Sequence, residues 1–595
     1  MNYPTLIRAP WDRIIALCIC GAAIYFVIVQ LPTLRFNDDY TLVVIAWMLA
    51  FAAYLFAIAP ATLAHRDRDR WWRTHRATAV ILGAITLAGF FLRVWQIGSI
   101  PFTLSGDEAA FGLDALHIIR GEIGTPFATS WMSQPTMSFF YGGLAMRFCG
   151  ATQTALRLPW AVIGALSVPI TFWMVARLKG AAFGLITATL LATYHYHIHF
   201  SRLSVNNIAA TFWMGLAILF FFRARGGNRP LDWLWLGAAC GGALYFYQGA
   251  RLTPLVILGT IFYLTIYDRG FWRARRRGLL IALGAFLIVA APMLQFAVRF
   301  PDDFNARANQ IGMLYTGAIV DIARQRGASI ATVLFDQFRH AALAFNSYSD
   351  RTAWYGLGQP LLDPIFGTLF LLGLGYGTIR AVMPRADRRI FPIVAWWWSG
   401  MILGGMMTES PPTTSRLITL SVPVCFFIAL ALMQIVRLAK RAIAGLPARA
   451  VLISAVLFFA LISLKTYFVD YTPRFIFGGD HAQAATRLAP RVNEMAQTHR
   501  FYFIGAPFMY AGFATIPFLA PTVNITDIAQ PLDASRATDW RAGARGIVFI
   551  FAAERIAELA HAQNLFPQGR IEEIRAPIDN RMITTLFIVP PISNE

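Results

Sequence analysis

Two adjacent acids, Asp107 and Glu108, are the residues of this sequence best suited to catalysis. They stand in the segment SGDEAAFGLDALHIIRG (105–121), just after an apolar run. A carboxylate at the start of a helix stays ionised and fixed in place, as a general base needs. The same residues also have a structural explanation, because Ser105 and Glu108 match a capping box. The two explanations are compatible, and we expect Asp107 and Glu108 to be catalytic.

Basic, amide and aromatic residues gather at the ends of three other apolar runs, in YHYHIHFSRLSVNN (194–207), YFYQGAR (245–251) and ESPPTTSR (409–416). A single arginine at such a place usually does no more than reach the membrane surface with its charge. Several of them opposite an acidic pair are suited to hold the phosphate of a lipid. The residues predicted to bind substrate or lipid phosphate are His199, Arg202, Asn206, Asn207, Tyr247, Gln248, Arg251 and Arg416.

The metal-ligating residues form no strong motif. His195 and His199 would share a helix face, but the Glu of the zinc motif H-E-x-x-H is absent. The five cysteines lie in apolar stretches without metal or disulfide spacing. A divalent metal ion stays open as a cofactor, and no metal ligand is predicted. Without a glycine-rich phosphate loop, a soluble nucleotide-dependent mechanism has no support.

The composition indicates which elements position these side chains. Of the 595 residues, 57% are hydrophobic and 14% are charged. Soluble domains average about 25% charged residues, so an ordinary soluble, disordered or coiled-coil protein is excluded. Apolar runs of about 20 residues recur, which predicts a polytopic α-helical membrane protein of about 13 spans. The predicted spans are residues 13–31, 41–63, 77–97, 157–176, 181–200, 208–223, 231–248, 252–267, 278–296, 361–379, 390–407, 417–436 and 449–467.

The net charge of +20 is explained by membrane orientation rather than by a nucleic-acid partner. Lys and Arg concentrate in alternate connections between spans, which the positive-inside rule places in the cytoplasm. The N-terminus is then cytoplasmic, and the candidate site residues share the outer face. This path requires that residues 135–150 form a helix at the membrane interface. A short extra span there is the alternative, and the charge pattern argues against it.

Three parts follow along the chain. We expect an N-terminal transmembrane hairpin at 1–76 and a transmembrane catalytic module at 77–467, with external loops at about 98–156 and 297–360. Short apolar runs of strand length, FYFIG (501–505), GIVFIFAAE (546–554) and TTLFIVP (584–590), predict a small soluble α/β domain at 468–595. By counting the spans we expect that domain on the outer side of the membrane, in the periplasm if the organism is Gram-negative.

The order of these motifs resembles the GT-C superfamily of membrane glycosyltransferases, especially its protein O-mannosyltransferase and lipid A aminoarabinose transferase groups. The resemblance rests on SGDEAAFGLDALHIIRG, SQPTMSFFYGG, ALRLPWAVIGALSVP, HIHFSRLSVNN and YFYQGARLTP, within residues 77–470. It implies inverting transfer of one sugar from a polyprenyl-phosphate carrier to an envelope acceptor at the outer face of the bacterial inner membrane. Asp107 would be the base, Glu108 its partner orienting the acceptor or a metal, and the outer arginines would hold the lipid phosphate.

The sequence departs from that family at a position that bears on metal binding. Many relatives carry an acid near the position of Asn207, whereas this chain has the amides Asn206 and Asn207, which bind a divalent metal less well. The N-terminal hairpin also precedes the usual first core helix of the family.

Two other functions compete with transfer. A transporter or flippase of lipid-linked substrates would also use arginines on a polytopic frame, but it should place ionisable residues within its spans and show two similar halves. A scaffold protein would leave the acidic pair and the end-of-span arginines unexplained. Membrane lipid and a lipid-linked sugar are therefore the expected partners.

Overall fold

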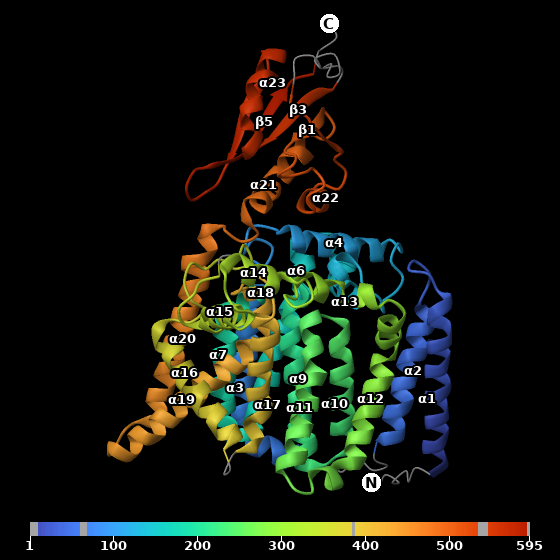
Figure 1. The fold of residues 1–595 in the computed structure, drawn as a ribbon, viewed down its shortest axis with the longest axis vertical. Coiled ribbons are helices and arrows are strands. Elements are labelled where there is room, and N and C mark those ends of the chain that lie inside the picture. Colours follow the sequence, from blue (N-terminus) through green and yellow to red (C-terminus); the bar gives the residue numbers. More distant parts are fainter. Residues whose placement is uncertain (1–9, 60–67, 351, 384–386, 533–544, 592–595) are drawn as a thin grey trace.

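The computed structural model describes residues 10–59, 68–350, 352–383, 387–532 and 545–591. Figure 1 shows a helical bundle with a small sheet-containing domain standing on one end of it. The helix α4 (Gly106–Ile119) lies across that end of the bundle, between the spans and the sheet-containing domain. We call it the α4 end.

Ten helical segments of the described residues are long and apolar enough to cross a membrane, which makes this a multi-pass membrane protein. Their outward side chains include large apolar groups such as Leu42, Leu87 and Phe262, which are about two-thirds exposed. Lipid must cover such surfaces, because exposing them to water is costly. The ten segments contain α1 (Pro10–Gln30), α2 (Thr41–Ile58), α3 (Arg68–Val94), α6 (Gln153–Lys179), α9 (Ala209–Gly227), α11 (Leu252–Tyr267), α12 (Phe271–Arg299), α16 (Pro364–Val382), α19 (Ser421–Ala442) and α20 (Ala448–Leu464).

The three remaining predicted spans coincide with shorter helices, each continued by a second helical piece. The pairs are α7 (Ala181–Thr193) with α8 (His195–Ser201), α10 (Pro230–Gly242) with η4 (Ala243–Tyr245), and α17 (Phe391–Gly400) with the π-helical η8 (Met401–Met406). Between α7 and α8, Tyr194 takes an extended conformation and breaks the helix. Within the described residues each of the thirteen predicted spans is thus mostly helical, while residues 60–63 of the second span lie outside them. The three pairs are shorter than the other spans because their helices are interrupted or end early.

Residues 135–150 form the helix α5 (Thr136–Cys149) as predicted. It packs against α4 and α6, and the Tyr141 hydroxyl donates to the Pro159 carbonyl at 2.7 Å. At 1.5 Å per residue its 14 residues reach about 21 Å, less than the roughly 30 Å of a bilayer core. Its predicted place at the membrane interface, like the orientation of the whole bundle, stays a prediction.

The long loop after α12 is mostly helical and lies at the α4 end (Figure 1). It contains α13 (Pro301–Ile311), α14 (Ala318–Arg326) and α15 (Ile330–Ala342). Another short helix at this end, α18 (Thr414–Leu417), precedes α19. Polar and charged side chains dominate α13, none of whose residues is buried. The helix α13 therefore covers the ends of the spans rather than forming part of the bundle core.

The C-terminal part carries a five-stranded mixed sheet of order β2-β1-β3-β5-β4. Strands β1, β2 and β3 are parallel, and β5 runs antiparallel to both β3 and β4. The three predicted apolar strands are the central ones, and the small α/β domain is confirmed. The two strands not predicted are at the edges, where β2 is short and β4 is polar. The elements are α21 (Gly479–Met495), β1 (His499–Ile504), α22 (Thr515–Leu519), β2 (Ile525–Asp527), β3 (Gly546–Ala552), α23 (Leu559–Leu565), β4 (Arg570–Arg575) and β5 (Met582–Val589).

Candidate active site

The start of α4 is fixed by the capping box that the sequence predicts. The Glu108 amide donates to the Ser105 hydroxyl at 3.2 Å, and the Ser105 amide donates to the Glu108 carboxylate at 3.3 Å. Asp107 lies between them in the first turn, where the positive end of the helix dipole favours a carboxylate. The cap therefore determines where the two neighbouring acids point.

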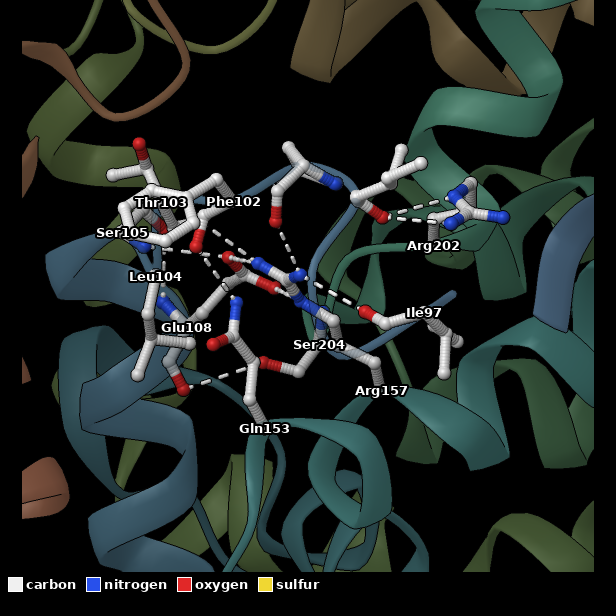
Figure 2. Close-up of polar contacts among 12 residues, drawn as sticks. Ile97, Phe102, Thr103, Leu104, Ser105, Glu108, Gln153, Arg157, Arg202 and Ser204 are labelled. Carbon is white, nitrogen blue, oxygen red and sulfur yellow. Dashed lines mark hydrogen bonds and ion pairs between the residues drawn. The ribbon is translucent and has the colours of Figure 1, made fainter. Parts of the chain in front are cut away.

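Glu108 points into the protein and forms a fully buried ion pair with Arg157 of α6 (Figure 2). The guanidinium donates to both carboxylate oxygens, at 2.8 and 2.9 Å. The Ser204 amide donates to the same carboxylate at 2.9 Å. Arg157 also donates to the carbonyls of Ile97, Pro101 and Thr103. The expected role of Glu108 in orienting an acceptor or metal does not fit this position, because its carboxylate is committed to this network.

Arg202 also faces away from the candidate site. Its guanidinium donates to the backbone carbonyls of Leu92, Trp95 and Ile100, at 2.6 to 3.0 Å. These carbonyls belong to the end of α3 and the turn that follows it, so Arg202 replaces the missing helical partners there. The prediction that Arg202 holds a lipid phosphate does not fit this position.

His199 is buried among aromatic rings. Its Nε2 atom lies 2.7 Å from the Trp354 carbonyl, and its ring stacks on Tyr355 with centroids 4.3 Å apart. The ring packs α8 against the loop after α15, and it does not line the cavity described next. Its predicted role in substrate binding is likewise not supported by its position.

The other predicted site residues line one cavity of about 510 Å³ at the α4 end of the bundle. They come from α4, from the start of the α9 span, from the turn after α10 and from α18. These residues are far apart in the sequence. We predicted that they lie together because the span ends that carry them are on the same side of the membrane. The predicted residues in the cavity wall are Asp107, Asn206, Asn207, Tyr247, Gln248, Arg251 and Arg416.

Arg251 has unused hydrogen-bonding capacity. Its Nη1 atom donates to the Phe304 carbonyl at 2.8 Å, and its guanidinium lies 3.5 Å from the centroid of the Phe304 ring. Its Nε and Nη2 atoms are buried and have no partner among the described residues. Burying unpaired donors is costly, so this group is suited to meet an anion in the cavity.

Arg416 lies in the cavity wall and is fixed there by contacts with Glu409. Its Nη1 atom donates to the Glu409 carbonyl at 2.6 Å, and its Nη2 atom lies 3.6 Å from the Glu409 carboxylate. The exposed carboxylate compensates only part of the charge. Arg416 therefore adds a second cation to the cavity wall.

Arg307 of α13 is a third cation that the sequence analysis missed. It lines the cavity together with Phe304, Ala308 and Ile311 of the same helix, and its Nη1 atom donates to Gln310 at 2.7 Å. Residues three, four and seven apart share one helix face. That spacing within PDDFNARANQI is the signal that could have revealed this helix face. The sequence analysis predicts only an external loop for these residues.

Asp107 is the only carboxylate among the described residues that line the cavity. Burial raises its pKa from 3.8 to about 6, while Arg307 lowers the pKa and Glu108 raises it. No described residue donates a hydrogen bond to its carboxylate. A carboxylate with a pKa near the working pH is ionised yet basic enough to accept a proton, so Asp107 can serve as a general base.

The amides in the cavity wall hold its segments together. The Nδ2 atom of Asn206 donates to Gln134 at 2.9 Å and to the Phe246 carbonyl at 2.6 Å. The Nδ2 atom of Asn207 donates to the Ser415 carbonyl at 2.7 Å, and that carbonyl precedes Arg416. These bonds join the α9 span to the segments that carry the other site residues.

A divalent metal fits this wall poorly. Within the described ranges no three His, Cys, Asp or Glu residues are grouped to hold a metal ion. The cavity wall offers one carboxylate, Asp107, against the three arginines Arg251, Arg307 and Arg416. Divalent cations such as Mg²⁺ and Ca²⁺ prefer several oxygen ligands, and nearby positive charges oppose their binding.

The C-terminal domain packs against α4 and the residues just before it. The Thr486 hydroxyl accepts from the Leu104 amide at 3.1 Å, and the Thr515 hydroxyl donates to the Leu104 carbonyl at 3.0 Å. A Cβ atom added at Gly106 would lie 2.8 Å from the ring of Phe513, and one at Gly112 would lie 2.4 Å from the ring of Phe518. The segment after β1 and the helix α22 therefore press directly on the helix that presents Asp107.

The chain is similar to known proteins in sequence and in fold. Residues 133–296 match the family described as dolichyl-phosphate-mannose-protein mannosyltransferase. ArnT from Cupriavidus metallidurans, in its crystal structure bound to undecaprenyl phosphate, aligns with a TM-score of 0.51 at 14% identity, over 86% of this chain and 98% of that chain. The chain has the GT-C fold.

This fold is the one that the resemblance in the sequence implies. The apo structure of the same ArnT aligns with a TM-score of 0.49 at 13% identity, over 86% of this chain and 98% of that chain. The archaeal oligosaccharyltransferase AglB from Archaeoglobus fulgidus, in complex with an inhibitory peptide and a dolichol-phosphate, aligns with a TM-score of 0.46 at 14% identity, over 80% of this chain and 70% of that chain. No curated protein matches the sequence.

Proposed function

We propose that this protein is an inverting glycosyltransferase that moves one sugar from a polyprenyl-phosphate carrier to an envelope acceptor. The observation that carries the proposal is one cavity in which a basic carboxylate, Asp107, faces the arginines Arg251, Arg307 and Arg416. A GT-C fold shared with a protein crystallised with undecaprenyl phosphate supports the same donor class.

The reaction needs a base on one side of the sugar and cations on the other. Asp107 takes the proton of the acceptor hydroxyl while the acceptor oxygen forms a bond to the anomeric carbon. The bond between that carbon and the phosphate oxygen breaks, and its electron pair stays on the carrier phosphate. A single displacement inverts the anomeric centre. Because the leaving group is a weakly basic phosphate, cations can stabilise it without a general acid.

The cavity wall also contains an apolar part suited to the carrier chain. Leu252 and Leu255 of α11 line it on one side, and Leu403 of η8 lines it on another. Leu252 and Leu255 follow Arg251 into a membrane span, so a phosphate held at the arginine would leave its lipid tail beside apolar side chains. This arrangement fits a lipid-linked donor better than a free nucleotide sugar.

The distribution of lysine and arginine supports a periplasmic site in a bacterial inner membrane, with the N-terminus in the cytoplasm. The candidate residues then work at the outer face, where lipid-linked sugars are used. A transporter or flippase of such lipids is the competing function. It is less well supported, because the charged residues that line this cavity are at the α4 end of the spans.

Mass spectrometry of envelope glycans, lipids and proteins from cells with and without the protein tests the proposal. We expect one sugar to disappear from one acceptor and the lipid-linked donor to accumulate at the outer face. Accumulation of the donor at the cytoplasmic face, with loss of several products, would favour the transporter instead. Purified protein should also transfer the sugar in detergent, where transport across a bilayer is impossible.

A further inference from the structure

A second cavity of about 470 Å³ lies between the N-terminal hairpin and the rest of the bundle. We call it the hairpin cavity. The turn between α1 and α2, the segment 125–133 and the end of α12 form its wall. Because the hairpin precedes the helices that carry the proposed reaction, transfer chemistry alone does not explain this cavity.

The hairpin is firmly attached, so the cavity is a fixed feature of the fold. The Trp47 ring nitrogen donates to the Ile288 carbonyl at 3.1 Å, and the Gln295 side chain donates to the Ile28 carbonyl at 2.8 Å. The Gly124 amide donates to the Phe36 carbonyl at 3.0 Å, which ties the hairpin turn to the first external loop. The contacts join the hairpin both to a span and to a loop of the proposed catalytic module.

The hairpin cavity is positively charged at one side. Arg35 lies in the turn between two spans, and Arg299 is the last residue of α12. Neither guanidinium has a hydrogen bond or ion pair with a described residue, and Arg299 contacts the ring of Phe300, with its guanidinium carbon 5.3 Å from the ring centroid. Asp303 is the one acid among the described residues of the wall. The excess charge suits an anion with oxygen acceptors.

The other side of the hairpin cavity is apolar and contains one unsatisfied acceptor. Its apolar wall includes Leu31, Phe127 and Phe296. The Oε1 atom of Gln295 is buried and has no partner among the described residues. Leaving a buried oxygen without a hydrogen bond is costly, so a ligand that brings a donor such as a hydroxyl group would bind favourably there. The cavity therefore matches a ligand that combines an anion, a hydroxyl group and apolar chains.

The position of the hairpin cavity indicates where such a ligand comes from. The turn between α1 and α2 and the end of α12, which form its wall, lie at the α4 end of the bundle, where the spans end (Figure 1). A guanidinium donates readily to the oxygens of a phosphate group, and the apolar wall beside the arginines suits acyl chains. We propose that the hairpin cavity binds the phosphate head group of a membrane phospholipid with head-group hydroxyls, whose chains extend along α1 and α12.

The hairpin cavity shares walls with the cavity that Asp107 lines, which we call the reaction cavity. In the segment 129–134, Ser130 and Ser133 line the hairpin cavity, whereas Trp131 and Gln134 line the reaction cavity. At the start of α13, Asp303 lines the hairpin cavity and Arg307 lines the reaction cavity. A bound lipid would thus support the same segments that carry the site residues. The inference itself does not rest on the proposed function, because binding is measured without turnover.

The test is lipid retention by purified full-length protein in nanodiscs of phosphatidylcholine doped with phosphatidylglycerol, followed by transfer to detergent and native mass spectrometry. We expect wild type to retain phosphatidylglycerol, and the double variant Arg35→Ala/Arg299→Ala to retain about tenfold less because two charge-assisted contacts are lost. Leu34→Trp, which fills the cavity from the hairpin side, should lower retention without changing charge. Arg147→Ala, an exposed arginine of α5 that lines neither cavity, is the matched control.

Equal retention by wild type, the double variant and Leu34→Trp would overturn the proposal. Loss of retention in Arg147→Ala to the same extent would also overturn it, because the effect would then follow overall charge. A thermal melt of each variant in the same detergent separates loss of the lipid site from loss of the fold. Inorganic phosphate in place of phosphatidylglycerol should not stabilise the protein, since the apolar chains contribute to binding.

Discussion

Arg157 and Glu108 form a buried ion pair that ties α6 to the first turn of α4. Glu108 is the neighbour of Asp107. The ion pair turns the Glu108 carboxylate into the protein, while Asp107 lines the cavity. The two adjacent acids thus have different roles. Glu108 fixes the helix, and Asp107 lines the cavity.

Replacing Glu108 by Gln should destabilise the protein more than it harms the chemistry. Removing one partner of a buried ion pair leaves the other charge uncompensated, which typically costs about 3–5 kcal/mol. We expect a clearly lower midpoint of thermal unfolding in detergent. The molecules that remain folded should keep the acid limb of the pH profile that Asp107 sets. Unchanged stability with complete loss of transfer would instead make Glu108 a catalytic group.

Alanine at Arg251, Arg307 or Arg416 should weaken binding of the lipid-linked donor. Each charge-assisted contact to phosphate contributes about 1.5–3 kcal/mol, so the KM for donor should rise about tenfold or more. The exposed Arg324 of α14 provides a control, and its alanine variant should behave as wild type. The measurement is donor dependence of the transfer rate. An unchanged KM in all three variants would remove these residues from the phosphate site.

The transfer rate should fall as pH decreases through about 6, because Asp107 must be ionised to accept a proton and burial raises its pKa to about 6. Below that pH the rate should drop about tenfold per pH unit, and above it the profile should be level. Intrinsic fluorescence over the same range checks that the fold is retained. A limb near pH 4, the ordinary range of an aspartate, would show that the site does not bury this carboxylate.

Removing divalent metal ions should leave transfer intact. The reaction cavity offers Asp107 as its one carboxylate among the described residues, and the three arginines can neutralise the phosphate instead. We expect full activity after treatment with a chelator and dialysis. Activity lost by that treatment and restored by one added metal would contradict the account.

Much of the fold was predictable because the membrane imposes it. Apolar runs had to form helices, and the charge pattern placed Asp107, Arg251 and Arg416 at helix ends that meet in one cavity. What the sequence could not reveal was the direction of each side chain. Arg202 looked like a phosphate ligand, but it binds the carbonyls that end α3. Those carbonyls lie about a hundred residues from Arg202 in the sequence, so the contact could not be predicted from its neighbours.

Arg307 is the reverse case, because it lines the cavity but was not predicted as a site residue. It belongs to a polar helix of a long loop, and only the folded chain shows that this helix covers the cavity. The position of the C-terminal domain on α4 was equally hidden, since a small α/β domain can attach by any face. Hydrophobic patterning predicts which segments are buried, and it does not identify their neighbours.

The most direct test of the account is the transfer rate of Asp107→Asn in purified, donor-bound protein. Folding favours the protonated form of Asp107, because its pKa is raised from 3.8 to about 6. The wild type therefore loses stability as pH rises through that interval, and the neutral Asn side chain avoids this loss. At neutral pH the variant should be at least as stable as wild type and should bind the donor. Its transfer rate should fall by about 10²–10⁴. A folded Asp107→Asn protein with near-normal turnover would contradict the account.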